Sequence, residues 1–327
     1  MKRQICVVAY VANRPDYSDS RKPSYWHLAV VKNCTAVVGA LVKDKDNFVK
    51  VLTSAQSDSS FVRNIKRTSP DVLLTGVSLE ITTQVAKSVA GSDTLILFTD
   101  TDYEKENPIS DEVDVGRSVT DACVNSCVKH LIYSTQMHVY ACIGLRCDAC
   151  DAKAHIADYI TAADIKETLV CIPFLYEDFL AGGALTPRKT TRTDTYKIVA
   201  PMGYIPMDTI ALEDVALCFR NLVANPTNWS GKTLSLSGDK MTIQEYAQML
   251  TDNVYPKIVK DAQVTPEEFI DYNEWDGAED MANYFDYLTR GVQRNNMNST
   301  MSLVSEIACF YDWAKANAKK VVAALEV

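Results

Sequence analysis

The sequence predicts an α/β fold, a doubly wound parallel sheet with a smaller helical lobe, and three observations support this prediction. The first is a series of short runs rich in β-branched residues, at positions 4–10, 48–53, 71–74, 94–99, 129–134, 168–173 and 232–237. Continuous apolar runs of this length are typical of parallel strands covered on both faces. The second is helical periodicity between these runs, and the third is a mainly helical segment near the end of the chain.

The helical periodicity is clearest in two segments. Apolar residues spaced by three and four run from Leu28 to Val42, and again from Val115 to Cys127. Each series marks one face of a helix, so we expect Cys123 and Cys127 to pack in a core. Strands that alternate with helices through right-handed crossovers form a doubly wound sheet.

After about residue 201 the pattern becomes mainly helical. A capping box predicts a helix that begins after Thr242, and a second helix should begin after Thr265, with proline in its first turn. Further helical patterns cover residues 281–288 and 310–323. We expect these helices to form a lobe over the carboxyl ends of the strands, where ligands bind in such sheets.

Composition and charge narrow the function classes. The chain has 327 residues, 47% of them apolar and 23% charged, which suits a globular protein with a real core. Its formal net charge of -9 disfavours direct binding to nucleic acid or to an anionic membrane. No signal-peptide pattern and no apolar run near 20 residues is evident. We therefore expect a cytoplasmic protein with reduced thiols, and a nuclear location stays open.

Ten irregularly spaced cysteines raise the question of a metal site. Cys147 and Cys150 have the spacing of a zinc-binding pair, and Cys142 and His155 lie nearby. No fourth ligand follows at a normal spacing, so we predict ordinary reduced thiols and no metal site. His27, His130 and His138 have no cysteine or carboxylate at a fixed spacing, so each is interpreted as a packed or surface histidine.

Several short motifs in order point to a family. They are LIYS from Leu131, IP-x-x-YED from Ile172, PMD from Pro206, DV from Asp214, GK from Gly231, EYA from Glu245, TPE from Thr265 and DMANYF from Asp280. Together they make the chain resemble the NmrA-like family of atypical short-chain dehydrogenases, which includes the NmrA-like redox-sensor proteins of animals. The resemblance extends over nearly the whole chain. It implies a Rossmann-type fold that binds NADP(H), and a regulator that binds partner proteins rather than a catalyst. It leaves open whether the protein forms a homodimer.

The loop after the first strand departs from the family pattern G-A-T-G-x-x-G-G. Glycines there permit a tight turn, close approach of the backbone to the pyrophosphate and close packing of the helix. Here Ala9 and Ala12 stand at two glycine positions, and an insertion follows at residues 13–32. An alternative alignment starts the strand at residues 28–31, again without a glycine loop. We expect residues 13–26 to be an exposed loop near the pyrophosphate position.

Two further family contacts are replaced. Ser54 stands where the resemblance implies an arginine for the ribose 2′-phosphate, and Ser78 where it implies an acidic residue near the adenine. Losing one charge-assisted contact costs about 1.5–3 kcal/mol. We therefore expect residues 1–200 to be a degenerate NAD(P)-binding Rossmann domain and residues 201–327 the smaller lobe. NADP(H) binding should be weak or lost, with NADPH preferred over NADH by less than about tenfold.

Other family positions for cofactor binding are retained. By resemblance they are Thr99, Asp100 and Thr101 after the fourth strand, at the place of the family's T-N-x, and Lys153 for the nicotinamide ribose. Tyr176, Glu177 and Asp178 match the end of the family's Y-F-E-N, with aspartate in place of asparagine. The nicotinamide half of the site is thus better preserved than the phosphate half.

No catalytic pair of a short-chain dehydrogenase is predicted. Such enzymes use Tyr-x-x-x-Lys, in which the lysine lowers the pKa of the tyrosine. The only such spacing is Tyr311 to Lys315, far from the expected site, and Ser134 has no tyrosine partner. We favour a regulatory or sensor protein that binds partner proteins through a degenerate site. A functional NADP(H)-binding redox sensor is the alternative, and an NAD(P)-dependent oxidoreductase is less favoured.

Overall fold

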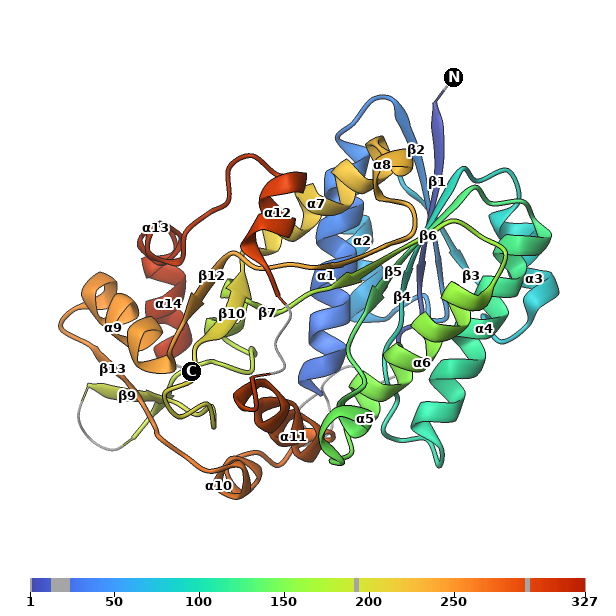
Figure 1. Ribbon diagram of the computed structural model, residues 1–327. Helices are drawn as coiled ribbons and strands as arrows, with labels where there is room; N and C mark the ends of the chain where they lie inside the picture. Colours follow the sequence, from blue (N-terminus) through green and yellow to red (C-terminus); the bar gives the residue numbers. More distant parts are fainter. Residues whose placement is uncertain (1, 13–23, 191–193, 292–294, 327) are drawn as a thin grey trace.

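A parallel sheet forms the centre of the molecule (Figure 1). The computed structural model describes residues 2–12, 24–190, 194–291 and 295–326. Within these ranges the main sheet has seven strands, in the order β11 (Lys232–Ser235), β6 (Glu167–Cys171), β5 (His130–Thr135), β4 (Thr94–Phe98), β1 (Arg3–Ala9), β2 (Asn47–Thr53) and β3 (Leu73–Gly76). All neighbouring pairs are parallel. The predicted fold and its strands are confirmed, and the strand order reverses between β1 and β4, where such sheets bind ligands.

Helices cover both faces of the sheet. One face is covered by α1 (Tyr25–Val42), α2 (Ser60–Thr68) and α7 (Leu212–Ala224), and the other by α3 (Thr82–Val89), α4 (Pro108–Asn125) and α6 (Asp148–Ala162). Strand β1 shows why both faces are apolar: Ile5 and Val7 enter one core, Cys6 and Val8 the other. Between α4 and α6, a Cβ on Gly116 would lie 2.5 Å from Ile156 Cγ1. This close approach requires glycine.

The smaller lobe lies beyond the carboxyl ends of the strands (Figure 1). Its helices include α9 (Ile243–Val254), α10 (Pro266–Asp271), α11 (Ala278–Thr289), α13 (Phe310–Ala316) and α14 (Ala318–Leu325). The capping boxes at Thr242 and Thr265 are both present. In the described ranges the lobe also contains two three-stranded sheets that the sequence did not predict: β12 (Asp239–Met241), β10 (Met207–Ile210) and β7 (Phe174–Leu175), and β13 (Ile258–Asp261), β9 (Thr195–Ile198) and β8 (Arg188–Lys189).

The chain passes between the two parts more than once. Strand β7 precedes residue 200 but pairs with β10 in the lobe, whereas β11 follows it and pairs with β6 in the main sheet. The division at residues 200 and 201 stays a prediction.

Helix α1 corrects two expectations for the segment after β1. Residues 28–31 are helical, so the alternative strand there is wrong. Tyr25 and Trp26 are helical and buried, so the predicted exposed loop ends before them, while residues 13–23 of the predicted insertion lie outside the described residues. By length and composition alone α1 could cross a membrane, with a mean hydropathy of 1.3. More than half of it is buried and it packs on α7, as a core helix does.

One of the two cysteines predicted to pack in a core does not do so. All ten lie in the described ranges and all are free thiols. Cys123 is buried on α4, but Cys127 lies beyond the end of that helix and is exposed, with a φ of 54°. The expected core packing of Cys127 is wrong because α4 ends at Asn125, and the chain must turn there to enter β5.

Candidate functional site

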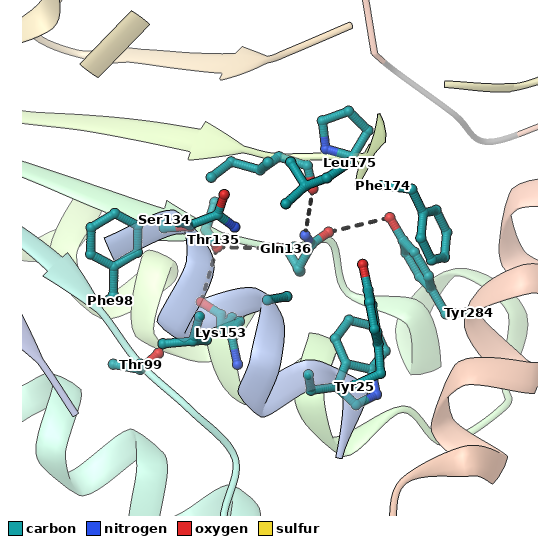
Figure 2. A pocket seen from close by; sticks show the side chains of 16 residues that line it. Tyr25, Phe98, Thr99, Ser134, Thr135, Gln136, Lys153, Phe174, Leu175 and Tyr284 are labelled. Atoms are coloured by element: carbon teal, nitrogen blue, oxygen red, sulfur yellow. Dashed lines mark hydrogen bonds between the residues drawn. The ribbon is translucent and has the colours of Figure 1, made fainter. Parts of the chain in front are cut away.

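A small cavity lies at the carboxyl ends of β4, β5 and β6 (Figure 2). The residues that line this central cavity are Tyr25, Trp26, Ala29, Val30, Asn33, Phe98, Thr99, Ser134, Thr135, Gln136, Lys153, Ile172, Pro173, Phe174, Leu175 and Tyr284. Its volume is about 60 Å³, whereas pockets for organic ligands measure about 300–1,000 Å³. The central cavity therefore has room for a few water-sized groups and none for a dinucleotide.

The first turn of α1 closes the central cavity. The Tyr25 ring stacks on Phe174 with centroids 5.9 Å apart, and the Trp26 ring meets the edge of Tyr284 at 5.6 Å. Both α1 residues belong to the apolar core of the lobe, whereas Val37 and Leu41, further along α1, belong to the core of the sheet. The helix thus extends past the sheet edge and fills space between the sheet and the lobe.

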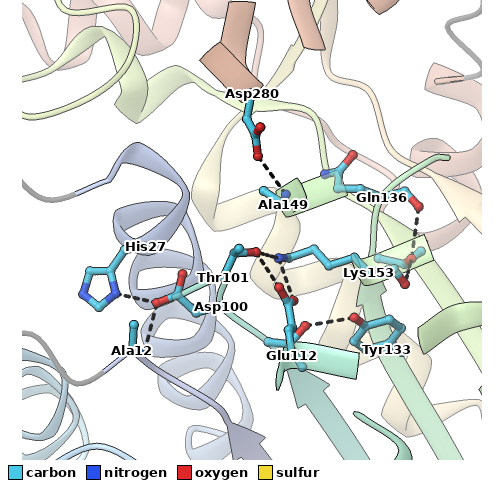
Figure 3. Close-up of polar contacts among 12 residues, drawn as sticks. Ala12, His27, Asp100, Thr101, Glu112, Tyr133, Gln136, Ala149, Lys153 and Asp280 are labelled. Carbon is cyan, nitrogen blue, oxygen red and sulfur yellow. Dashed lines mark hydrogen bonds and ion pairs between the residues drawn. The ribbon is translucent and has the colours of Figure 1, made fainter. Parts of the chain in front are cut away.

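Asp100 is one of the retained family positions, and a residue of α1 binds it (Figure 3). His27 Nδ1 lies 2.6 Å from Asp100 Oδ2, and the Ala12 N–H donates to the same oxygen at 3.1 Å. Asp100 is fully buried. Burial raises its pKa, but the charge and hydrogen bond of His27 and the Ala12 N–H outweigh burial, so the pKa is lowered overall. A buried carboxylate is therefore held by α1 and by the loop that follows β1.

Asp178, a second retained position, is also bound to α1. The Tyr25 hydroxyl donates to its Oδ2, and Lys32 Nζ lies 3.1 Å from its Oδ1. The Leu175 N–H donates to Oδ2 at 2.7 Å. Burial and the Asp178 charge together raise the pKa of Tyr25, so this phenol stays protonated and keeps donating.

Lys153, the position expected at the nicotinamide ribose, lines the central cavity but has a partner of its own (Figure 3). Its Nζ lies 2.9 Å from Glu112 Oε1, and both side chains are buried. Thr101 donates to the other Glu112 oxygen and lies 3.5 Å from the ammonium. Thr99 lines the cavity and shares a hydrogen bond of 2.9 Å with the Tyr133 hydroxyl.

Ser54 and Ala12, two positions where the chain departs from the family pattern, help to close the loop after β1. Ser54 Oγ accepts from the Val11 N–H at 3.1 Å and donates to the Val11 carbonyl at 3.2 Å. The Ala12 N–H is already bound to Asp100, and Ala9 is buried in β1. Ser78 is exposed beyond β3. Two backbone donors that follow β1 are thus satisfied within the protein, although a pyrophosphate site needs such donors free.

Tyr176 and Glu177 are placed away from the central cavity, in η1 (Tyr176–Phe179). The Tyr176 hydroxyl lies 3.0 Å from Asp239 and 2.9 Å from the Ala308 carbonyl. Glu177 accepts from the Leu212 N–H at 2.9 Å and from Trp313 Nε1 at 3.0 Å. Burial raises the pKa of Glu177 against these hydrogen bonds. The two residues join η1 to α7, α13 and the lobe.

Two polar atoms around the central cavity are unsatisfied. Trp26 Nε1 and Asn33 Oδ1 are buried and have no hydrogen-bond partner among the described residues, and both residues line the cavity. The first is a donor and the second an acceptor. Most buried polar atoms in native proteins are paired, so these two are the groups that a small guest in the cavity would engage.

Sequence reasoning identified only part of this site. Thr99 and Lys153 line the cavity and Asp100, Thr101 and Asp178 lie in the network beside it, but the cofactor role of all seven family positions stays a prediction. It missed Gln136 and Tyr284, whose side chains approach at 3.5 Å, and the aromatic wall around Phe174. Two features of the sequence could have identified them: Gln136 directly follows strand β5, and Tyr284 lies in the DMANYF motif that begins at Asp280.

The strand order and a cavity at the carboxyl ends define the class: an α/β protein with a Rossmann-type, NAD(P)-binding fold. The profile of the NmrA-like family matches residues 29–308. The chain therefore belongs to the NmrA-like family. The match begins inside α1, after β1 and the altered loop.

One relative matches about two thirds of the chain in sequence, and two solved structures share the fold over almost the whole chain. An NmrA-like family domain-containing protein of Dictyostelium discoideum is 22% identical over 232 residues, which cover 68% of this chain and 74% of that protein. NmrA, a negative transcriptional regulator solved in complex with NADP, has a TM-score of 0.73 at 14% identity and covers 99% of this chain and 98% of its own. An NADPH-dependent quinone oxidoreductase from Escherichia coli has a TM-score of 0.70 at 14% identity, with 95% and 98% covered.

Proposed function

We propose that this protein is a non-catalytic regulator of the NmrA-like family, which acts by binding a partner protein and whose dinucleotide site is closed by its own helix α1. The observation that carries the proposal is the pairing of three retained positions. Asp100 is bound by His27, Asp178 by Tyr25 and Lys32, and Lys153 by Glu112. A cofactor would have to break these contacts before it could use the same groups.

The free energy needed to release Asp100 and Asp178 from α1 supports weak cofactor binding. A hydrogen bond to a charged group contributes about 1.5–3 kcal/mol. Freeing Asp100 from His27 and Asp178 from Tyr25 therefore costs about 3–6 kcal/mol, which lowers affinity by about 10²–10⁴. Ser54 offers no positive charge to a 2′-phosphate, so NADPH gains little over NADH.

A redox sensor that does bind NADP(H) is the second candidate. It is favoured by the fold shared with NmrA, whose structure was solved with NADP and with NAD. If the protein is such a sensor, the first turn of α1 unwinds or shifts when the dinucleotide binds. An oxidoreductase is less favoured because Tyr311 and Lys315, the one pair with dehydrogenase spacing, lie on α13 and do not line the central cavity.

A capture experiment tests the proposal. The full chain is immobilised and bound proteins are quantified with no nucleotide, with NADPH and with NADP⁺, each at about 1 mM. We expect a reproducible partner whose amount does not depend on nucleotide, and no turnover of NADPH on a panel of quinones and carbonyl compounds. A partner lost or gained on adding NADPH would favour the sensor, and turnover would favour the oxidoreductase.

A further inference from the structure

Two exposed imidazoles and a carboxylate meet on the surface of α6, outside the central cavity. His155 and Asp158 lie three residues apart on α6, so they share one face of the helix. His138 comes from the segment between β5 and α5 (Val139–Ile143) and reaches the same face. His155 and Asp158 are exposed and His138 is half-buried. We call these three residues the imidazole cluster.

The three side chains are close enough to share one ion. Their nearest ligand atoms all lie within 4.8 Å of one another. His138 Nε2 is 2.9 Å from Asp158 Oδ2, and the His138 and His155 rings meet edge to face with centroids 4.9 Å apart. Ligands bound at about 2.0–2.2 Å to a tetrahedral ion lie about 3.3–3.6 Å apart. To reach that spacing, the exposed His155 side chain must move closer to the other two ligands.

We propose that the imidazole cluster is a binding site for a divalent transition-metal ion, with Zn²⁺ as the representative ion. Two imidazole nitrogens and one carboxylate oxygen suit Zn²⁺, Ni²⁺ and Cu²⁺, whereas Mg²⁺ and Ca²⁺ prefer an all-oxygen set. The alternative without a metal is that His138 and Asp158 form a surface ion pair, which contributes only about 0–1 kcal/mol to stability. That pair does not explain why the His155 ring packs against His138, within reach of Asp158.

The surroundings leave coordination positions open. His155 and Asp158 line a broad surface hollow together with Arg117 and Arg146. Both arginines are engaged: Arg146 is bound to Asp148 at 2.5 Å, and Arg117 lies over the Tyr159 ring at 5.5 Å. Three protein ligands with a fourth position toward solvent is the arrangement of metal sites that accept a water or another ligand.

Metal binding would join two separate segments. His138 follows Gln136, which lines the central cavity, by two residues, and α6 carries Lys153 in the same cavity. An ion held by His138, His155 and Asp158 therefore fixes the segment after β5 to α6. Since a ligand that binds only the folded protein stabilises it, the midpoint of thermal unfolding should rise with metal concentration.

Calorimetric titration of the chelator-treated, reduced full chain with Zn²⁺ and then Ni²⁺ tests the site. We expect one equivalent to bind with a micromolar dissociation constant, at least tenfold weaker binding in His155→Ala and in Asp158→Asn, and no competition by Mg²⁺ or Ca²⁺. Asp164→Asn is the matched control, because Asp164 is an exposed carboxylate just beyond α6 and outside the cluster. Cys142→Ser tests the exposed thiol of α5 as a competing ligand. Both controls should bind like the wild type.

Either of two results would overturn the proposal. One is no stoichiometric binding of Zn²⁺ or Ni²⁺ to the wild type. The other is binding that survives both His155→Ala and Asp158→Asn, or that is lost in Cys142→Ser. Because the cluster side chains lie at the surface, the metal-free variants should unfold at the same temperature as the wild type, and this measurement separates lost binding from misfolding.

Discussion

The two ends of helix α1 pack in different cores. Toward its C-terminal end, Val37, Val38 and Leu41 lie in the core between the sheet and α7, as the first helix of a Rossmann-type fold does. At its N-terminal end, Tyr25 and Trp26 lie in the core of the lobe. The same helix thus builds the fold at one end and fills the ligand crevice at the other.

The difference supports the proposal that this chain keeps polar residues at the family positions while α1 closes the dinucleotide site. The sheet end of α1 contributes apolar side chains such as Val37, Val38 and Leu41 to the core. The lobe end contributes Tyr25, His27 and Lys32, which bind the Asp100 and Asp178 carboxylates. Retained family residues therefore serve as internal partners, and their presence alone does not indicate an open cofactor site.

The largest effect is expected at the sheet end. Leu41→Ala should lower the free energy of unfolding by about 3 kcal/mol, since Leu41 is fully buried and the truncation leaves a cavity. Val42→Ala is the control, because Val42 is 38% exposed and should cost less than about 1 kcal/mol. Urea unfolding measures both. Equal losses in the two variants would contradict the assignment of this end of α1 to the sheet core.

A second prediction compares pH dependence in the sheet and in the lobe. Burial, and then the Lys166 charge, lower the pKa of His130 in β5 from 6.5 to about 4. Its contribution to stability is therefore complete above about pH 6.5 and is lost as the pH falls toward 4. At 1.36 kcal/mol per pH unit the loss is about 3 kcal/mol. Relative to the wild type, His130→Gln should accordingly be more stable at pH 4.5 than at pH 7.

The contribution of Asp280 on α11 to stability should depend on pH in the opposite direction. Burial raises its pKa to about 6, against hydrogen bonds from Tyr103 and Ala149. The stability that it contributes when protonated is present below about pH 3.8 and is lost as the pH rises through 6, again about 3 kcal/mol. Asp280→Asn should thus gain on the wild type as the pH rises from 4.5 to 7. Urea unfolding at pH 4.5 and pH 7 measures the stability of both variants relative to the wild type. If the relative stability of His130→Gln and of Asp280→Asn changed with pH in the same direction, the opposite pKa shifts assigned to His130 and Asp280 would be refuted.

The smallest stability effect is expected at the lobe end of α1. Tyr25→Phe keeps the ring on Phe174 but removes the hydrogen bond to Asp178, which should cost about 1.5–3 kcal/mol. Tyr284→Phe is the matched control. Its hydroxyl lies 3.5 Å from Gln136 Oε1, so its loss should cost under about 1 kcal/mol. If the control were the more costly variant, the Asp178 contact would not hold α1 in place.

The fold could be predicted closely because its signals are local. Buried parallel strands such as β1 and β4 are apolar on both faces, and Thr242 and Thr265 cap their helices through a residue three positions away. The small sheets of the lobe escaped prediction, since β7 has only two residues and its pairing with β10 depends on the folded chain.

The site could be predicted only in part because its contacts are distant in sequence. Tyr25 is 153 residues from Asp178, and His27 is 73 residues from Asp100. Alignment to a glycine loop assigned residues 13–32 to an insertion, which hid the fact that this stretch contains the start of α1 with the buried Tyr25 and Trp26. The contact of His138 with Asp158 could not be predicted for the same reason, since Asp158 lies 20 residues away.

Calorimetric titration of the wild type with NADPH and with NADH tests the central claim most directly. If α1 closes the dinucleotide site and Ser54 cannot hold the 2′-phosphate, both dissociation constants should be weaker than about 100 µM and should differ by less than about tenfold, or 1.4 kcal/mol. A micromolar or tighter constant for NADPH, well below that for NADH, would contradict the account.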